Sequence, residues 1–272
     1  MNLDNIDPKL WKRIAHRFDL KYFDYFGREW GWVINRFVSR ENRVVMRGIK
    51  CKRGFSETDL VIYLPNHRSH YDYLVLGYMF WEQGMKIPRF AAGENLFFWP
   101  FDNLWRKLGA YAVDRGNMDW NYRKTMVEYV THLVVDEKCD QIDFVGGGRS
   151  YTGRLQEPKL GLLGVVWKAS QQIQENVVGQ PVFLDYDPGV IEEKYFEALK
   201  KFKYSNQYWA YVGLDLYAFF KQFIWPKEIK LSIEFGDPFS IKKCKSKKEL
   251  GEKVQSVLSE MACESMMDEF GI

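Results

Sequence analysis

Long apolar runs are missing from this chain of 272 residues. No segment approaches the ~18–20 consecutive apolar residues that a bilayer-spanning helix needs, and the N-terminus has no signal-peptide pattern. We therefore expect no membrane span. Net charge is also small, because 39 Lys and Arg face 36 Asp and Glu, which argues against a dedicated nucleic-acid binder. The four cysteines are scattered without paired or metal-like spacing, as in a reduced, cytosol-facing protein.

Several familiar signatures are absent as well. The chain has no Gly-Lys-Ser/Thr of a P-loop, no G-x-G-x-x-G opening a helix and no G-x-S-x-G nucleophile elbow, so a nucleotide enzyme or a serine hydrolase is unsupported. It also lacks internal repeats and Pro/Gly/Ser-rich linkers, which favours a single domain with helical flanks. We expect an N-terminal amphipathic helical segment over residues 1–45 and the main domain over residues 46–272.

Aromatic residues, by contrast, are abundant at 17%. Residues 10–38 interleave Trp, Phe and Tyr with Lys and Arg, and residues 208–225 are rich in aromatics but interrupted by charges. Both patterns are typical of helices that lie in a membrane interface, and the lysines of residues 242–248 would add attraction to anionic lipid. The alternatives are helices packed on the domain's own core and an ordinary solvated basic surface. The membrane interpretation predicts a peripheral protein on the cytoplasmic face.

Short apolar strands alternate with helices along the rest of the chain. This pattern predicts an α/β fold with a central, largely parallel mixed sheet of about six to seven strands covered by helices. Ser246 and Glu249 form a capping box that opens a C-terminal helix. We expect strands over residues 60–64, 88–92, 110–113, 142–145, 181–186 and 230–235, and further helices over residues 73–81, 121–135 and 161–174.

The first polar cluster lies on the expected turn between a strand and a helix. His67 and Asp72 are spaced so that the carboxylate can fix the imidazole tautomer while the imidazole takes a proton from a hydroxyl. Two alternatives remain open at this point. Ser69 and Asp72 also fit a capping box, and His67, His70 and Asp72 could ligate a metal, although the sequence offers no further ligand cluster.

The second polar cluster is the stretch DFVGGGRSYTGRLQEPKLG, which follows the fourth expected strand. Its glycines let the backbone approach a ligand closely, and guanidinium groups bind phosphate with paired hydrogen bonds. The stretch therefore suits a phosphate monoester, with a plain basic surface loop as the alternative. The candidate donors are Gly147, Gly148, Arg149, Ser150, Thr152, Arg154 and Lys159.

Four stretches, in this order, resemble the glycerolipid acyltransferase family, especially its glycerol-3-phosphate and dihydroxyacetone-phosphate branch. They are NHRSHYDYLVL, GENLFFWPFDNLWRKLGAYAVDRG, FVGGGRSYTGRLQEPKLG and PVFLDYDPGVIEE, and together they cover about half of the chain. The resemblance implies that His67 is the general base and that Asp72 orients it. It also implies phosphate binding by Arg149, with Arg115, Arg154 and Lys159 as helpers.

The same resemblance implies transfer of a fatty acyl group to a hydroxyl of glycerol 3-phosphate in phospholipid synthesis. The donor would be a thioester of coenzyme A or acyl carrier protein, and no metal or other cofactor would be needed. One position departs from the family pattern, because Gly146 replaces a glutamate expected to bind the acceptor or to anchor the arginine. Glu94, Asp185 and Asp187 are candidates to replace that acid. The alternatives are a 1-acylglycerol-3-phosphate acceptor and a catalytically weak, lipid-binding relative.

Overall fold

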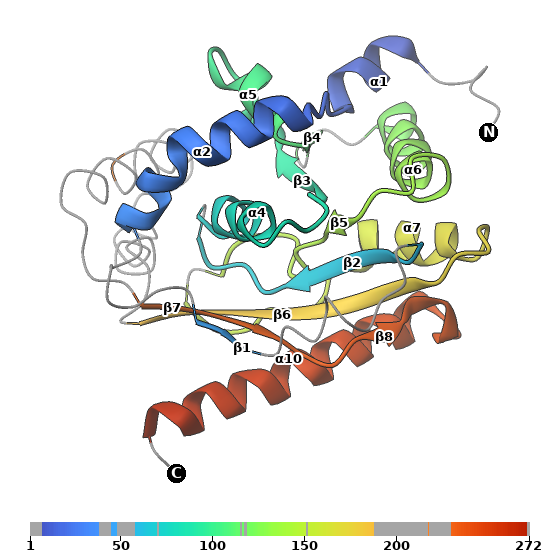
Figure 1. Cartoon of the computed structure of the whole chain (residues 1–272). Helices are drawn as coiled ribbons and strands as arrows, with labels where there is room; N and C mark the ends of the chain where they lie inside the picture. The colour runs from blue at the N-terminus through green and yellow to red at the C-terminus, as the bar shows by residue number, and fades with distance from the viewer. Residues whose placement is uncertain are drawn as a thin grey trace, which may run out of the picture.

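The computed structural model describes residues 7–37, 45–47, 58–69, 71–114, 116, 119–150, 152–187, 217 and 230–270. Its described strands form one eight-stranded sheet in the order β1-β7-β6-β2-β5-β3-β4, with β8 paired to β6 (Figure 1). The strands are β1 (Val45–Arg47), β2 (Leu60–Pro65), β3 (Arg89–Gly93), β4 (Ala110–Val113), β5 (Gln141–Ile142), β6 (Val177–Asp187), β7 (Lys230–Phe235) and β8 (Phe239–Ser240).

The sheet is mixed but mostly parallel, because only the β6–β7 and β6–β8 pairs of the described strands are antiparallel. This confirms the predicted fold class, and β1 and β8 add two short strands to the six that the sequence predicted. β2 lies between β6 and β5 and is buried along its whole length, which explains its uninterrupted apolar sequence. Since β2, β5, β3 and β4 run parallel, their carboxyl ends meet at one edge of the sheet.

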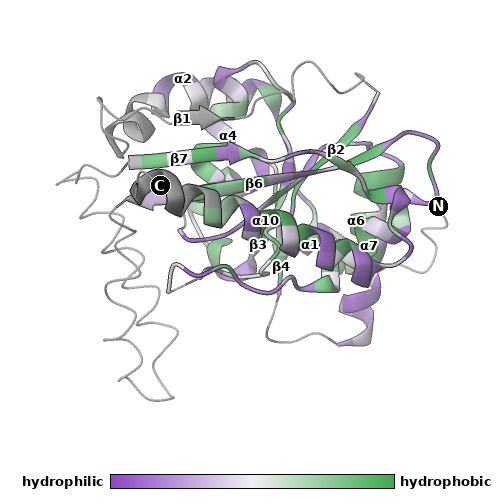
Figure 2. Ribbon diagram, turned by 90° about the horizontal axis from the view of Figure 1, so that it is seen from below, coloured by the Kyte–Doolittle hydropathy of each residue, from purple (hydrophilic) through white to green (hydrophobic). Residues whose placement is uncertain are grey.

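Helices cover both faces of the sheet. One core packs side chains of α1, α6, α7 and α10 against it, and a second core packs α4 and α5 on the opposite face. Hydrophobic residues run along β2 and β7, whereas the covering helices carry both hydrophobic and hydrophilic residues (Figure 2). The helices are α1 (Pro8–Ile14), α2 (Leu20–Phe37), α4 (Asp72–Glu82), η2 (Glu94–Leu96), α5 (Phe101–Lys107), α6 (Trp120–Val135), α7 (Leu160–Ser170), η3 (Ile241–Lys243) and α10 (Lys247–Phe270).

The N-terminal flank forms two helices rather than one. α1 ends at Ile14, and Asp19 caps the start of α2 by accepting hydrogen bonds from the N–H groups of Lys21 and Tyr22. Ile14 and Phe23 are buried, so the inner face of this flank packs on the domain. Of the second aromatic segment, residues 208–225, only residue 217 is described. No described helix has the length and apolarity to cross a bilayer.

In the basic run of residues 242–248, Lys242 makes hydrogen bonds that stabilise the fold. Lys242 Nζ donates to the carbonyl of Ile173, 2.7 Å away, just beyond the end of α7. Ser246 caps α10 as predicted, because its Oγ accepts from the Glu249 N–H, whereas the Glu249 carboxylate accepts from the N–H of Lys245, one residue before the serine. At least Lys242 therefore stabilises the fold and is not simply solvated.

Candidate active site

The turn between β2 and α4 is fixed to β6 by a buried asparagine. Asn66 Oδ1 accepts the N–H of Leu184 at 2.7 Å, and Asn66 Nδ2 donates to the carbonyl of Leu184 at 2.9 Å. The side-chain amide thus extends the β2–β6 pairing one step beyond Pro65, where the strand ends. As a result, the next residue, His67, has a defined position at the carboxyl edge of the sheet.

His67 and Asp72 are in direct contact, with 2.7 Å between Nδ1 and Oδ2. The Asp72 side chain is fully buried and accepts three further hydrogen bonds. The N–H groups of Arg68 and Ser69 donate to Oδ2 at 2.7 and 3.1 Å, and the Tyr186 hydroxyl donates to Oδ1 at 2.5 Å. These donors come from two separate segments and hold the carboxylate in a single orientation.

This geometry sets the tautomer of His67. A carboxylate only accepts hydrogen bonds, so Nδ1 carries the proton and Nε2 carries the lone pair that a general base uses. The imidazole is 12% exposed and lies 4.1 Å, centroid to centroid, from the ring of Phe144. The expected capping box of Ser69 and Asp72 does not cap α4, because the N-cap residue is Tyr71, whose side chain makes no capping hydrogen bond. The Asp72 carboxylate still accepts from the Ser69 N–H at 3.1 Å.

The metal alternative gains no support within the described residues, where no group of three or more His, Cys, Asp or Glu is placed to hold an ion. His70, one of the three proposed ligands, lies outside the described residues.

The glycine-rich loop between β5 and α7 lies against the histidine turn. The N–H of Ser150 donates to the carbonyl of His67 at 2.7 Å, and the N–H of Lys159 donates to the carbonyl of Val145 at 2.7 Å. Gly147 and Gly153 have φ of +62° and +73°, in the left-handed region that favours glycine. The glycines therefore let the loop fold back on the turn.

A small hollow separates the turn from this loop, and it contains some of the predicted site residues. It is lined by Asn66, His67, Arg68, Val145, Gly146, Ser150, Arg154, Leu155 and Gln156. Gly147, Gly148, Arg149 and Lys159 belong to the same loop but do not line the hollow, and Asp72 lies behind His67. Arg115 lies outside the described residues.

Two of the acids expected to replace the missing glutamate at position 146 are already paired. Glu94 binds Arg13, and Asp185 Oδ1 accepts from Arg68 Nη1 at 2.6 Å. The side chain of Asp187, the third candidate, lies outside the described residues. The expected compensation by a nearby acid thus remains a prediction, with two candidates bound to arginines.

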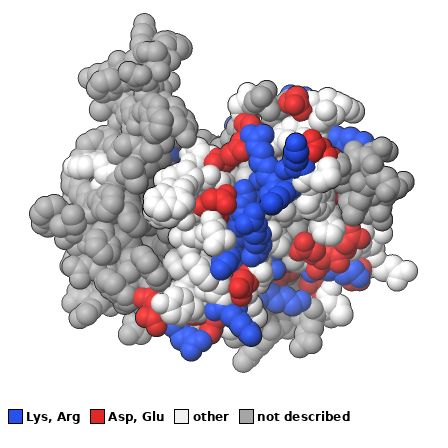
Figure 3. All heavy atoms as spheres, turned by 90° about the horizontal axis from the view of Figure 1, so that it is seen from above, with Lys and Arg blue, Asp and Glu red and all other residues white. Residues whose placement is uncertain are grey.

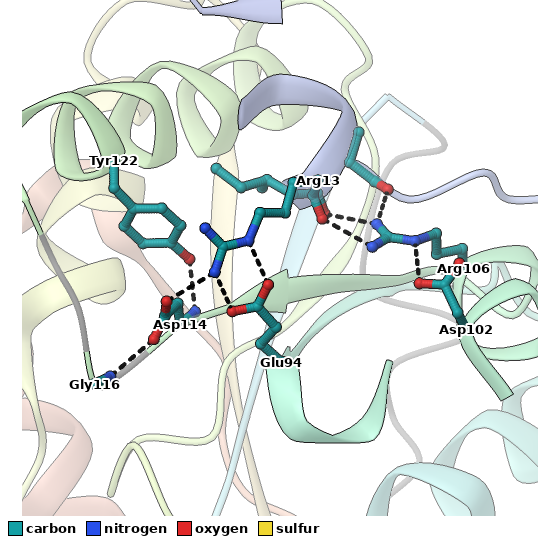
Figure 4. Close-up of polar contacts among 9 residues, drawn as sticks. Arg13, Glu94, Asp102, Arg106, Asp114, Gly116 and Tyr122 are labelled. Carbon is teal, nitrogen blue, oxygen red and sulfur yellow. Dashed lines mark hydrogen bonds and ion pairs between the residues drawn. The ribbon is translucent and has the colours of Figure 1, made fainter. Parts of the chain in front are cut away.

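A network of charges joins α1 to the carboxyl ends of β3 and β4 (Figure 4). The Arg13 guanidinium binds Glu94, with Nη2 2.5 Å from Oε2, and Nη2 also lies 2.9 Å from Asp114 Oδ2. The hydrogen bond to Glu94 raises the pKa of Arg13 above its usual value. The Tyr122 hydroxyl accepts the N–H of Asp114 at 2.6 Å. These contacts fix Asp114, the residue immediately before the predicted phosphate ligand at position 115.

Arg106 on α5 holds the end of α1 in the same network. Its guanidinium donates to the carbonyls of Arg13 (2.8 Å) and Ala15 (2.6 Å), while Nε donates to Asp102 at 2.9 Å. Arg106 is buried, so its charge is compensated by these backbone carbonyls and by Asp102.

Sequence reasoning missed the supporting residues of the site. Tyr186 lies in a stretch that resembles the family's fourth block, but nothing in its spacing shows that it reaches Asp72. In the sequence, Asn66 was interpreted only as a residue that ends a strand. Both contacts join segments more than 100 residues apart, so only the β2–β6 register reveals them.

The sequence identifies the family. A model of the family described as Acyltransferase matches residues 48–184, just over half of the chain. The chain therefore belongs to the acyltransferase family, and its resemblance to glycerolipid acyltransferases is confirmed.

Curated relatives bear the name glycerol-3-phosphate acyltransferase. The protein of Hamiltonella defensa subsp. Acyrthosiphon pisum (strain 5AT) is 33% identical over 183 residues, which cover 66% of this chain and 22% of that protein. The protein of Shewanella frigidimarina (strain NCIMB 400) is 37% identical over 156 residues, which cover 56% of this chain and 19% of that protein. The chain thus matches about a fifth of the length of these relatives.

A solved structure has a related fold. It is the 1-acyl-sn-glycerophosphate (LPA) acyltransferase PlsC from Thermotoga maritima, with a TM-score of 0.55 and 18% identity. The likeness covers 91% of this chain and 79% of that one and concerns the fold.

Proposed function

We propose that this protein transfers a fatty acyl group from an acyl thioester to a hydroxyl of glycerol 3-phosphate. The observation that carries the proposal is the His67–Asp72 pair, held at the edge of the sheet beside a glycine-rich loop with basic side chains. The names of the curated relatives favour glycerol 3-phosphate as the acceptor.

The residues present support a direct transfer. His67 Nε2 takes the proton of the acceptor hydroxyl while Asp72 stabilises the imidazolium that forms. The acceptor oxygen attacks the thioester carbonyl, forming a C–O bond and a tetrahedral intermediate. That intermediate collapses with breakage of the C–S bond, and the thiolate of coenzyme A or acyl carrier protein takes up the proton from His67. Arg149, Arg154 and Lys159 would bind the phosphate, together with Ser150 and the loop N–H groups.

The test is an assay of the purified chain with labelled acyl-CoA and acyl-ACP against a panel of acceptors. The proposal expects acylation of glycerol 3-phosphate and little acylation of glycerol, which lacks the phosphate. A preference for 1-acylglycerol 3-phosphate would favour the second candidate acceptor, the kind for which the structural relative is named. No transfer to any acceptor from either donor would leave the lipid-binding alternative.

We also propose that the protein binds membranes peripherally through the start of α5 and the outer side of α2. Phe98, Trp99 and Phe101, called the aromatic tip below, are 46%, 89% and 38% exposed, and Leu20 and Tyr25 on α2 are also exposed. Aromatic side chains of this kind insert among lipid headgroups.

Basic side chains accompany this apolar surface. Arg17 and Lys21 are exposed at the start of α2, and backbone hydrogen bonds join residues 17 and 19 to the end of α5. Seen from above, a band of Lys and Arg crosses the described part of the molecule, with Asp and Glu along its edges (Figure 3). Cations beside exposed aromatics suit a bilayer that contains anionic lipid.

Vesicle flotation tests the membrane proposal with a matched control. Trp99→Ser should reduce binding to anionic vesicles, whereas Trp120→Ser, at a 78% exposed tryptophan on α6, should leave it unchanged. High salt should release part of the bound protein because it screens the cations. Equal binding by wild type and Trp99→Ser would contradict a role for the aromatic tip.

A further inference from the structure

Gln156 occupies the space that a side chain at position 146 would fill. A Cβ atom added to Gly146 would collide with Gln156 Oε1 and would lie 3.0 Å from Gln156 Cβ, closer than such atoms normally approach. Glycine at position 146 and glutamine at position 156 are therefore complementary, since any larger residue at 146 requires Gln156 to move.

Hydrogen bonding orients the Gln156 carboxamide. Nε2 donates to the carbonyl of Arg149 at 3.1 Å, and because a carbonyl only accepts, the amide nitrogen must face it. Oε1 then lies on the side of Gly146, and both residues line the hollow that contains His67. Gln156 thus brings a hydrogen-bond acceptor into the hollow of the base and binds the backbone of the predicted phosphate-binding arginine.

We infer that Gln156 is a substrate-binding residue that takes the place of the glutamate found in the family pattern at position 146. Its Oε1 accepts a hydrogen bond from a hydroxyl of the acceptor, which turns the reacting oxygen toward His67, and its Nε2 holds the loop at Arg149. The inference rests on the proposed acyl transfer. It explains how the hollow still contains a side-chain oxygen that accepts a hydrogen bond from the substrate, although Glu94 and Asp185 are bound to arginines.

The decisive variant is Gln156→Leu, which keeps most of the side-chain volume and removes the hydrogen-bonding atoms. If Oε1 binds and orients the acceptor, the KM for glycerol 3-phosphate should rise about tenfold, equivalent to ~1.4 kcal/mol, and kcat should fall as well because the reacting oxygen is no longer turned toward His67. The KM for the acyl thioester should not change. An unchanged acceptor KM would show that Gln156 does not bind the acceptor and would overturn the inference.

A residue exchange provides a second test that does not depend on Gln156→Leu folding. Gly146→Glu alone should collide with Gln156 and reduce activity at least tenfold, and Gln156→Gly alone should raise the acceptor KM. The double variant Gly146→Glu/Gln156→Gly moves the side chain that accepts the hydrogen bond from position 156 to position 146. It should be more active than either single variant. A double variant no better than the worse single variant would refute the exchange.

Failure of the inference can be distinguished from failure of the proposed function. Wild-type protein that acylates no acceptor contradicts the proposed function itself. Active wild-type protein with an unchanged KM in Gln156→Leu contradicts only the role of Gln156. Thermal unfolding of each variant shows whether a lost activity reflects a lost fold.

Discussion

The two nitrogen atoms of His67 have different tasks. Nδ1 is bound to a buried carboxylate, and Nε2 is the atom that takes a proton in the proposed reaction. His67→Ala should lower turnover by about 10²–10⁴-fold, the usual contribution of general-base catalysis, and leave the unfolding temperature nearly unchanged. Steady-state acyl transfer and a melting curve check this. Near-normal turnover in the variant would exclude His67 as the base.

Tyr186 should affect the same reaction more weakly. Its hydroxyl donates to Asp72 Oδ1, so Tyr186→Phe removes one of four hydrogen bonds to the carboxylate and leaves three in place. The expected loss is about 1 kcal/mol of transition-state stabilisation, or roughly fivefold in kcat, with an unchanged acceptor KM. A change in KM alone would indicate that the hydroxyl contacts substrate instead.

Arg149 should discriminate acceptors by their phosphate. Arg149→Ala should weaken the binding of glycerol 3-phosphate by about 1.5–3 kcal/mol, the contribution of a charge-assisted hydrogen bond. Lys168→Ala, at an exposed cation on the outer side of α7, is the matched control and should have little effect. The measurement compares the KM for glycerol 3-phosphate in the two variants. Equal values would mean that Arg149 does not bind the phosphate.

At the scale of elements, sequence reasoning located β4 and β7 at their observed bounds and β2 within one residue. These strands are short apolar runs with clear ends. It started β6 at residue 181, four residues late, because the Gly-Gln pair at 179 and 180, directly before a proline, resembles a turn. The strand continues through them because it pairs with β2, and Gly179 leaves room for the ring of Phe239, 2.8 Å from where a Cβ would lie.

The candidate site, like the strands, could be predicted from the sequence only in part. His67 and Asp72 are close in sequence, so their spacing alone suggested the pair, and the glycine-rich loop was evident from its composition. The role of Gln156 was hidden, because it depends on how the loop folds back over Gly146. Arg13 was hidden for a similar reason, since its partners Glu94 and Asp114 follow two different strands.

The contact of Arg106 on α5 with the end of α1 should contribute to the stability of the fold. Arg106→Met should destabilise the fold by about 1–3 kcal/mol, because partly buried carbonyls at the end of α1 lose their donor. Lys107→Met on the same helix is the control. Lys107 lies over the Tyr22 ring at 4.5 Å, a contact expected to contribute about 0.5–1 kcal/mol. Urea unfolding of both variants measures the difference, and equal destabilisation would contradict a special role for Arg106.

At the scale of the whole molecule, the parallel strands bring distant segments to one edge. His67 follows β2, the glycine-rich loop follows β5, and Glu94 and Asp114 follow β3 and β4. α1 closes this edge through Arg13. The proposed chemistry therefore depends on the topology of the sheet as much as on any single motif, as is usual for sites at the carboxyl ends of parallel strands.

Two acids that flank β5 should govern stability against pH: Asp140 is buried, and Asp143 is half-buried with its Oδ2 atom enclosed. Burial raises the pKa of Asp143 to about 7 and that of Asp140 to about 6, and Asp143 Oδ2 has no hydrogen-bond partner among the described residues. Between about pH 4 and pH 7 the folded protein thus holds protons that the unfolded chain has released, so the free energy of unfolding should fall as the pH rises.

Asp143→Asn tests this assignment because asparagine cannot ionise. Wild type should lose up to about 4 kcal/mol between pH 4 and pH 8 through Asp143, and the variant should lose much less, making it the more stable protein at pH 8. Urea unfolding of wild type and Asp143→Asn across this pH range gives the two slopes. Parallel curves for wild type and Asp143→Asn would show that folding does not raise the pKa of Asp143 and would contradict the assignment.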